Sequence, residues 1–249
     1  RLLGIERKIF SFPLPASLQR KIWRWRGRSY VPPIGQVQLG VLRRLTPLSR
    51  EFGYRRGLPI DRYYIEKFLA DQSTNIFGRV LEIGDNTYTR RFGSHRVTHS
   101  DVLHVSEGNP NATCVGDLAG VNNLPANAFD CVILTQTLHF IYDVRLALKT
   151  IHCILKPGGV LLATVPGISQ IGIDEWADSW YWSFTVLSAE RLLRVVFPVG
   201  TVTVNAFGNV LAATAFLNGL AAEELRPDEL AHCDPRYQLL ITIRAVKQD

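Results

Sequence analysis

Three acidic residues follow apolar runs in the middle of the chain, in an order typical of a nucleotide-binding fold. Glu82 lies in the run Val80-Leu81-Glu82-Ile83-Gly84, Asp101 follows seventeen residues after Gly84, and Asp117 ends a third short run. In doubly wound folds, a glycine at a strand end lets the backbone approach a ligand, and a carboxylate after the next strand holds ribose hydroxyls. A single aspartate of this kind is more often a turn or a helix cap. The ordered series favours a cofactor crevice.

A second group of chemically capable side chains lies in one segment, residues 167–182. It combines aromatic rings with carboxylates, which is how proteins commonly bind sugars or cations, and loops at the carboxyl ends of parallel strands commonly bind substrate. We therefore predict a substrate site here; the alternative is that the rings cover a hydrophobic edge of the core. The side chains concerned are Asp174, Glu175, Trp176, Asp178, Trp180, Tyr181 and Trp182.

These groups need a sheet to position them, and the apolar pattern predicts one. After a helix over residues 60–69, short apolar runs alternate with helical segments, which indicates a parallel sheet. The last strand has no room for a crossover after it, so we expect it to pair in a reversed, hairpin-like manner. The predicted strands cover 80–83, 97–102, 112–115, 131–134, 160–165, 201–207 and 238–246, and the predicted helices cover 144–155, 188–196 and 210–225.

The composition allows one substantial core and disfavours several other classes. The chain has 249 residues, of which 47% are hydrophobic, a size typical of a single α/β unit. Its four cysteines form no CxxC pair, so we predict no zinc, no disulfide and a cytoplasmic location. The longest apolar stretch of the second half, residues 210–222, is too short to cross a bilayer. The chain begins at Arg1 and contains no methionine, which leaves open what precedes it.

The charge is concentrated at the start of the chain. Residues 1–60 contain 13 Lys and Arg against two Glu, and residues 14–25 alternate apolar and basic positions at helical spacing. We therefore expect residues 1–57 to be a basic, partly helical arm that binds an anionic surface such as the inner face of a membrane, with nucleic acid disfavoured as a partner. The alternative is that this helix packs on its own domain. Residues 58–249 are expected to form the main domain.

From about residue 60 onward, four motifs resemble the class I, Rossmann-like S-adenosylmethionine-dependent methyltransferases, in the branch with an LKPGG turn. They are VLEIG (80–84), GD (116–117), LPANAFDCVILTQTLHFIYD (124–143) and LKPGGVLLATVP (155–166). The resemblance implies a seven-stranded α/β sheet with its last strand antiparallel, and S-adenosylmethionine as the cofactor. Similar bacterial domains occur beside glycosyltransferases, which by analogy implies O-methylation of a small-molecule, glycan or glycolipid acceptor and a glycosyltransferase partner.

The resemblance also implies roles for individual residues. The methionine part of the cofactor would lie nearest Glu82, Gly84 and Asp85. The ribose would contact Asp101 and Val102, and the adenine would contact Asp117 and Leu118. The methyl group would be bordered by Thr135 and Gln136. Arg62, Tyr63 and Tyr64 stand where the family often adds cofactor or lid contacts. If the acceptor is a hydroxyl, a base is needed. The candidate bases are His139, Asp174 and Glu175, although a histidine between Leu138 and Phe140 is often only packed.

The glycine-rich loop departs from the family pattern. Where the family has Gly-x-Gly-x-Gly, this chain has Gly84-Asp85-Asn86-Thr87-Tyr88. Asn86 tolerates a left-handed conformation and would keep the turn, whereas Tyr88 cannot reproduce the close approach of glycine. The alternatives are therefore a methyltransferase with altered cofactor contacts and a non-catalytic scaffold. A nicotinamide-binding oxidoreductase is a third alternative, disfavoured because no GxGxxG follows the first strand.

Overall fold

A computed structural model of the chain describes residues 21, 25, 30–120, 123–173 and 177–248. It divides into two compact units, Arg1–Leu45 and Thr46–Asp249. In the first unit, the described part holds one short 3₁₀ helix, η1 (Gly40–Leu42), and its large apolar side chains are mostly exposed. The basic helix predicted over residues 14–25 lies outside the described residues except for Lys21 and Trp25.

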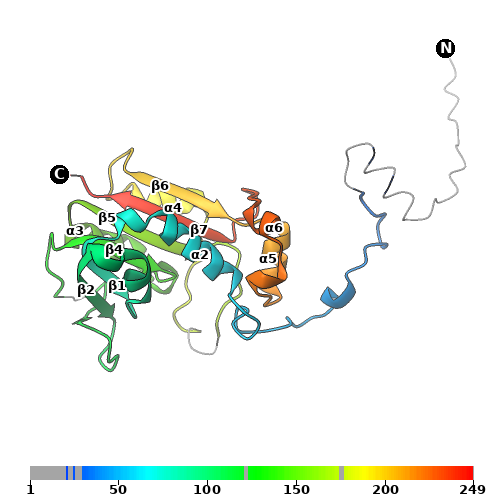
Figure 1. The fold of residues 1–249 in the computed structure, drawn as a ribbon, viewed down its shortest axis with the longest axis horizontal. Helices are drawn as coiled ribbons and strands as arrows, with labels where there is room; N and C mark the ends of the chain where they lie inside the picture. The colour runs from blue at the N-terminus through cyan, green and yellow to red at the C-terminus, as the bar shows by residue number, and fades with distance from the viewer. Residues whose placement is uncertain (1–20, 22–24, 26–29, 121–122, 174–176, 249) are drawn as a thin grey trace, which may run out of the picture. The chain divides into compact units, whose positions relative to one another are not determined.

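The second unit is built on one seven-stranded sheet of order β3-β2-β1-β4-β5-β7-β6 (Figure 1). Neighbouring strands from β3 to β5 are parallel, and β7 runs antiparallel to both β5 and β6. The predicted doubly wound, Rossmann-like sheet with its last strand antiparallel is confirmed. The strands are β1 (Gly78–Ile83), β2 (Val97–His104), β3 (Cys114–Val115), β4 (Phe129–Thr135), β5 (Leu155–Pro166), β6 (Val202–Phe207) and β7 (Leu240–Val246).

Helices cover both faces of the sheet, which explains why its strands are apolar runs without alternation. Leu81 and Leu134 pack with α3 and α4 on one face, while Val80 and Ile133 pack with α2, α5 and α6 on the other. The α-helices are α2 (Ile60–Asp71), α3 (Val144–Ile154), α4 (Val186–Leu193), α5 (Val210–Leu217) and α6 (Pro227–Ala231). Shorter helical turns are η2 (Ser73–Asn75), η3 (Thr89–Gly93), η4 (Ser94–Arg96), η5 (Leu138–Phe140) and η6 (Ala222–Glu224).

The segment before α2 packs against the end of α5. The backbone amides of Leu48 and Ser49 both donate to the carbonyl of Asn218, and a Cβ on Gly219 would lie 2.0 Å from the Ser49 carbonyl oxygen. This close approach requires glycine, whose φ of +70° also ends α5. The helix is therefore shorter than the predicted 210–225, and residues 46–57 belong to the second unit instead of the arm in which the sequence analysis placed them.

We expect truncation to show where the main unit begins. The Phe52 ring stacks on Trp180, with 6.3 Å between ring centroids, and packs at a tilt against Phe216, with 6.2 Å between centroids. A chain beginning at Leu58 loses these contacts, so its free energy of unfolding should fall by about 1–3 kcal/mol, lowering the melting temperature by roughly 3–10 °C. A chain beginning at Thr46 is the matched control and should melt like the full chain. Equal melting temperatures for the two truncated chains would contradict this boundary.

Candidate active site

The ends of β1 and β4 form the centre of the candidate site. The chain leaves these adjacent strands at the same edge of the sheet, because Glu82 is the Cα partner of Ile133. One side of β1 continues to β2 and β3, and the other side to β4 and β5. This reversal of strand order is the place where open α/β sheets bind ligands, outside the carboxyl ends of the strands.

The space beside the Gly84 backbone is open at this edge of the sheet. Its φ is +83°, and a Cβ built on it would meet no atom within 4 Å. The Gly84 carbonyl oxygen accepts a hydrogen bond from the Asn109 side chain at 2.6 Å. The room around Gly84 fits the close approach of a ligand to the backbone, as the sequence analysis expected of this residue.

The rest of the loop is held by side chains and not by glycines. The Asp85 carboxylate accepts from the Thr87 amide at 2.8 Å, and the Asn86 amide group donates to the Ser100 hydroxyl at 3.0 Å. Asn86 does not have a positive φ. The expectation that a left-handed Asn86 keeps the turn is therefore wrong, since its side chain is used to tie the loop to β2.

The buried Glu82 side chain holds this loop in place through hydrogen bonds. It exposes 3% of its surface, and its carboxylate accepts from the Thr89 amide (2.8 Å), the Thr89 hydroxyl (2.7 Å) and the Tyr88 amide (3.2 Å). Burial raises the pKa of Glu82 to about 7, against the lowering effect of these hydrogen bonds. The carboxylate expected beside the methionine part of the cofactor is thus occupied in fixing the segment that follows Gly84.

Tyr88, which replaces the last glycine of the family pattern, turns toward α2. Its hydroxyl accepts from the Arg62 guanidinium at 3.2 Å, and Arg62 also donates to the Tyr54 hydroxyl at 2.9 Å. Tyr64 instead lies in the core and donates to the Leu230 carbonyl at 3.0 Å, and Tyr63 packs edge-on against it. Of the three α2 residues singled out in the sequence, only Arg62 forms a described hydrogen bond to the loop.

Asp101 is not at the end of its strand. It lies in the middle of β2 as the partner of Leu81, and its carboxylate pairs with Arg79 at 2.7 Å. The register pairs Ile83 with Leu103, so the next residue, His104, comes out beside Gly84. The structure therefore does not bring Asp101 to the crevice, and Val102, which exposes 1%, is buried in the core.

We expect Asp101→Ala to leave cofactor affinity unchanged. Its ion pair with Arg79 is partly exposed, so the loss of stability should stay below about 1 kcal/mol. His104→Ala is the paired variant, and it should weaken S-adenosylhomocysteine binding because His104 stands where the ribose carboxylate was predicted. Isothermal titration calorimetry of both variants decides between them: a large loss of affinity in Asp101→Ala alone would restore the sequence-based assignment.

The end of β3 contributes Asp117 to the same edge. The Gly116 amide donates to the His104 carbonyl at 3.0 Å, which continues the β2–β3 pairing to this point. Asp117 is exposed and its carboxylate accepts from the Ala119 amide at 2.8 Å. Leu118 points into the core and exposes 4%. Asp117 is thus exposed at this edge of the sheet, while the Leu118 side chain serves mainly for packing.

In the part of the chain that the structure describes, three buried polar atoms without a hydrogen-bond partner belong to the turn after β4 and to Trp180, whose ring packs on that turn. They are Gln136 Oε1, His139 Nδ1 and Trp180 Nε1. Gln136 follows Thr135, the last residue of β4, and has a φ of +46°, a conformation that costs energy for a residue other than glycine and is concentrated at functional sites. Buried polar atoms in the core of a folded protein rarely lack a hydrogen-bond partner. Their concentration here indicates a place where a ligand supplies the partners.

His139 is a packed side chain rather than a free base. It exposes 1% and its ring lies 4.5 Å from the Trp180 ring. Burial lowers the pKa of His139 to about 3, so the ring is neutral and weakly basic at neutral pH. The predicted role of His139 as a general base therefore has little driving force. The other candidates, Asp174 and Glu175, lie outside the described residues, as does Trp176.

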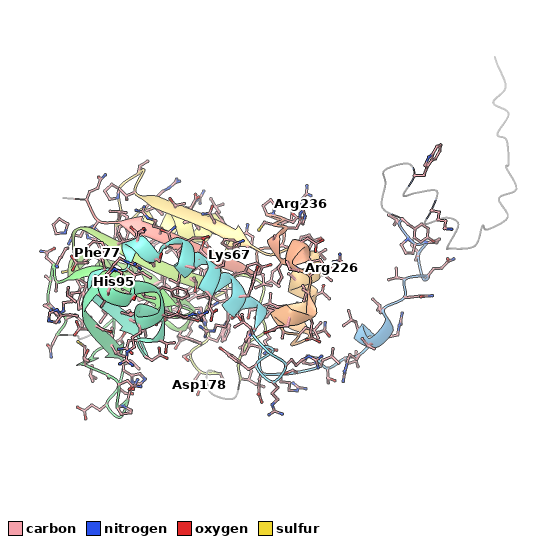
Figure 2. The ribbon with its side chains drawn as sticks, viewed as in Figure 1. Lys67, Phe77, His95, Asp178, Arg226 and Arg236 are labelled. Atoms are coloured by element: carbon pink, nitrogen blue, oxygen red, sulfur yellow. The ribbon has the colours of Figure 1, made fainter. Side chains whose placement is uncertain are left out.

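The aromatic segment is divided between two surroundings. Trp180 packs between His139, Phe140 and Phe52, whereas Tyr181 and Trp182 pack on Tyr142. The His139 carbonyl accepts from the amides of both Tyr181 and Trp182 at 2.9 and 3.3 Å, which ties this segment to the turn after β4. Asp178 is exposed at the surface (Figure 2).

Two features are absent from the part of the chain that the structure describes. No group of three or more His, Cys, Asp or Glu side chains there is arranged to hold a metal ion. No described helix combines the length and apolar character needed to span a bilayer.

Residues 86–163 match the family model of a methyltransferase domain. The fold is similar to that of a [4+2]-cyclase, SpnF, with 16% identity, a TM-score of 0.51, and coverage of 78% of this chain and 83% of that one. It is also similar to a SAM-dependent methyltransferase from Archaeoglobus fulgidus, with 12% identity, a TM-score of 0.50, and coverage of 75% and 94%. No curated protein matches the sequence. The match of residues 86–163 to a methyltransferase domain supports a methyltransferase enzyme, and the two solved structures show that the fold is shared.

Proposed function

We propose that this chain is an S-adenosylmethionine-dependent methyltransferase whose cofactor lies outside the ends of β1 and β4. The observation that carries the proposal is the pairing of an open backbone at Gly84 with a strained Gln136, whose buried side-chain oxygen has no partner. Both stand at the edge of the sheet where such folds bind nucleotides. The match of residues 86–163 to a methyltransferase domain supports the same conclusion.

The residues at this edge fit the cofactor. Gly84, His104, Asp117 and Gln136 are the residues that would hold it, and the bound cofactor would supply an electrophilic methyl group on a sulfonium. The protein's part is then to orient the acceptor and exclude water. The neutral rings of His139 and Trp180 suit that task, because they add no charge beside a cationic sulfonium.

The acceptor we propose is a small molecule, glycan or glycolipid that is methylated on oxygen. Support comes from the aromatic side chains of the 180–182 segment beside the turn after β4, since such rings commonly bind sugars. The basic residues of the first unit, residues 1–45, support action at an anionic surface, such as the cytoplasmic face of a membrane, and a glycosyltransferase is the partner proposed for them.

The direct test is calorimetric titration of the full chain with S-adenosylhomocysteine, with NADH as the comparison ligand. We expect binding of S-adenosylhomocysteine with a Kd of roughly 1–100 μM and no binding of NADH. Gln136→Ala should weaken the interaction at least about fivefold, and Lys67→Ala, an exposed position on α2, should not. Absence of S-adenosylhomocysteine binding would favour a non-catalytic scaffold, and binding of NADH alone would favour an oxidoreductase.

A further inference from the structure

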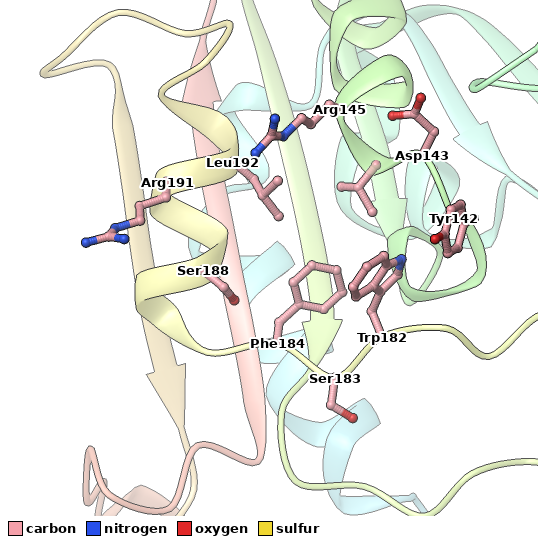
Figure 3. A pocket seen from close by; sticks show the side chains of 10 residues that line it. Tyr142, Asp143, Arg145, Trp182, Ser183, Phe184, Ser188, Arg191 and Leu192 are labelled. Atoms are coloured by element: carbon pink, nitrogen blue, oxygen red, sulfur yellow. The ribbon is translucent and has the colours of Figure 1, made fainter.

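A pocket of about 760 Å³ opens between the start of α3 and one side of α4 (Figure 3). Its size falls within the range of small-molecule sites, about 300–1,000 Å³. Its lining includes Trp182 but neither Trp180 nor His139, so it is distinct from the unpartnered polar atoms after β4. It nevertheless adjoins them, because the Trp182 amide donates to the His139 carbonyl.

The charge of this pocket is positive. Arg145 and Arg191 line it, and neither forms an ion pair with a carboxylate in the part of the chain that the structure describes. Asp143 is the only carboxylate among the described lining residues, and it caps α3 by accepting from the Leu146 amide at 3.0 Å. Arginine remains charged at any physiological pH and binds phosphates and carboxylates through a planar fork of donors.

The pocket has a charged part and an aromatic part. Figure 3 shows Arg145 reaching from α3 toward Leu192 of α4, with the rings of Phe184 and Trp182 beneath it, while Arg191 points away. Asp143 also points away from the two rings. Arg145 is therefore the guanidinium that faces the interior of the pocket.

Trp182 is held in place as a stacking surface. Its indole Nε1 donates to the Ile141 carbonyl at 3.0 Å, and its ring stacks on Tyr142 with 5.9 Å between centroids. It still exposes 39% of its surface, whereas Phe184 exposes 6% and closes the pocket from below. A fixed, partly exposed indole, in the same pocket as a guanidinium that has no carboxylate partner among the described residues, suits a ligand that carries both a ring and an anionic group.

We propose that this pocket binds the phosphate ester of a sugar or a nucleoside, with the phosphate on Arg145 and the ring on Trp182. The identification of this ligand as the acceptor rests on the proposed methyltransferase function, since the pocket adjoins the turn after β4 that carries Gln136 and His139. The binding itself does not depend on methyl transfer and is tested separately.

The test is calorimetric titration of the full chain with two phosphorylated probes and their neutral parents: glucose 1-phosphate against glucose, and uridine 5′-monophosphate against uridine. We expect at least one phosphorylated probe to bind with a Kd below roughly 1 mM and its parent to bind at least about tenfold more weakly. Whichever probe binds identifies the ring. Inorganic phosphate should bind at least about tenfold more weakly than that probe.

Variants assign the binding to this pocket. Arg145→Gln should weaken the probe at least about tenfold, because a charge-assisted contact is lost, while affinity for S-adenosylhomocysteine stays unchanged. Arg194→Gln is the matched control, since Arg194 caps the C-terminal end of α4, pairs with Glu190 and does not line the pocket. Trp182→Phe should retain part of the affinity and Trp182→Ala should not.

Several results would overturn the proposal. They are failure of both phosphorylated probes to bind at roughly 10 mM, equal binding of inorganic phosphate, or equal affinity of the Arg145→Gln variant. Any of these, together with intact S-adenosylhomocysteine binding, would refute the pocket proposal and leave the proposed function standing. If only S-adenosylhomocysteine failed to bind, the result would instead contradict the proposed function.

Discussion

We expect Glu82→Ala to lower the free energy of unfolding more than any other single substitution at the candidate site. The substitution leaves the buried amides of Tyr88 and Thr89 and the Thr89 hydroxyl without their acceptor. We expect the free energy of unfolding to fall by about 2–4 kcal/mol, and the melting temperature by roughly 5–15 °C. The same variant should lose S-adenosylhomocysteine binding, because the segment after Gly84 is no longer held. Thermal unfolding and calorimetry measure both effects.

Glu82→Gln is the control, because it keeps the shape and removes the titration. Burial raises the pKa of Glu82 from an ordinary value of 4.5 to about 7, so between these values the folded chain binds more protons than the unfolded chain. Stability contributed by this group is complete below about pH 4.5 and is lost as the pH rises through 7, by about 3 kcal/mol. Denaturant unfolding from pH 5 to 8 should show this fall in the natural chain and a flatter profile in Glu82→Gln. The same fall in both would contradict the assignment.

Replacing Trp180 with alanine should suppress methyl transfer by about a hundredfold, because small losses of orientation at a transfer site have effects of this size. Its ring packs against His139 and Phe140, in the turn that follows Gln136 in the chain, on the acceptor side of the proposed cofactor site. Affinity for S-adenosylhomocysteine should change less than about threefold, since Gly84, His104 and Asp117 are untouched. Radiolabelled methyl incorporation into glycolipid or small-molecule extracts measures the transfer.

A packing role for Trp180 predicts a different result. Truncation of a buried tryptophan costs roughly 3–5 kcal/mol, so a packing role would lower the melting temperature strongly and reduce transfer and cofactor binding alike. Trp180→Phe helps to separate the two, because it keeps the stacking on Phe52 while removing the unpaired Nε1. Restored stability with transfer still suppressed would support the acceptor role.

Most of the fold could be predicted from local pattern. The apolar runs around Val80, Cys131 and Val160 are buried on both faces, as is typical of the central strands of a parallel sheet that helices cover on both sides. The predicted antiparallel pairing of the last strand is confirmed by β7, which runs antiparallel to β5 and β6. Local pattern misplaced some element boundaries, because contacts between residues far apart in the sequence set them. For example, α5 ends at Leu217 because Ser49 approaches Gly219.

The candidate site was less predictable, because it depends on register and on partners that are remote in the sequence. Spacing alone placed Asp101 at a strand end, but the pairing of Ile83 with Leu103 puts His104 there and leaves Asp101 to Arg79. In the same way, the residue type of Glu82 suggested a ligand contact, while the fold buries it under the Thr89 turn.

The sequence by itself determined the class of fold and the strand ends from which the crevice is built, because the periodicity of apolar residues is a local property of the chain. Only the tertiary structure decided which side chains face a ligand. Trp180 and Trp182 are two residues apart, yet one packs on His139 and the other lines the pocket of Arg145. That separation arises from hydrogen bonds to the turn after β4 and from the packing of α3 and α4, neither of which is encoded within the segment itself.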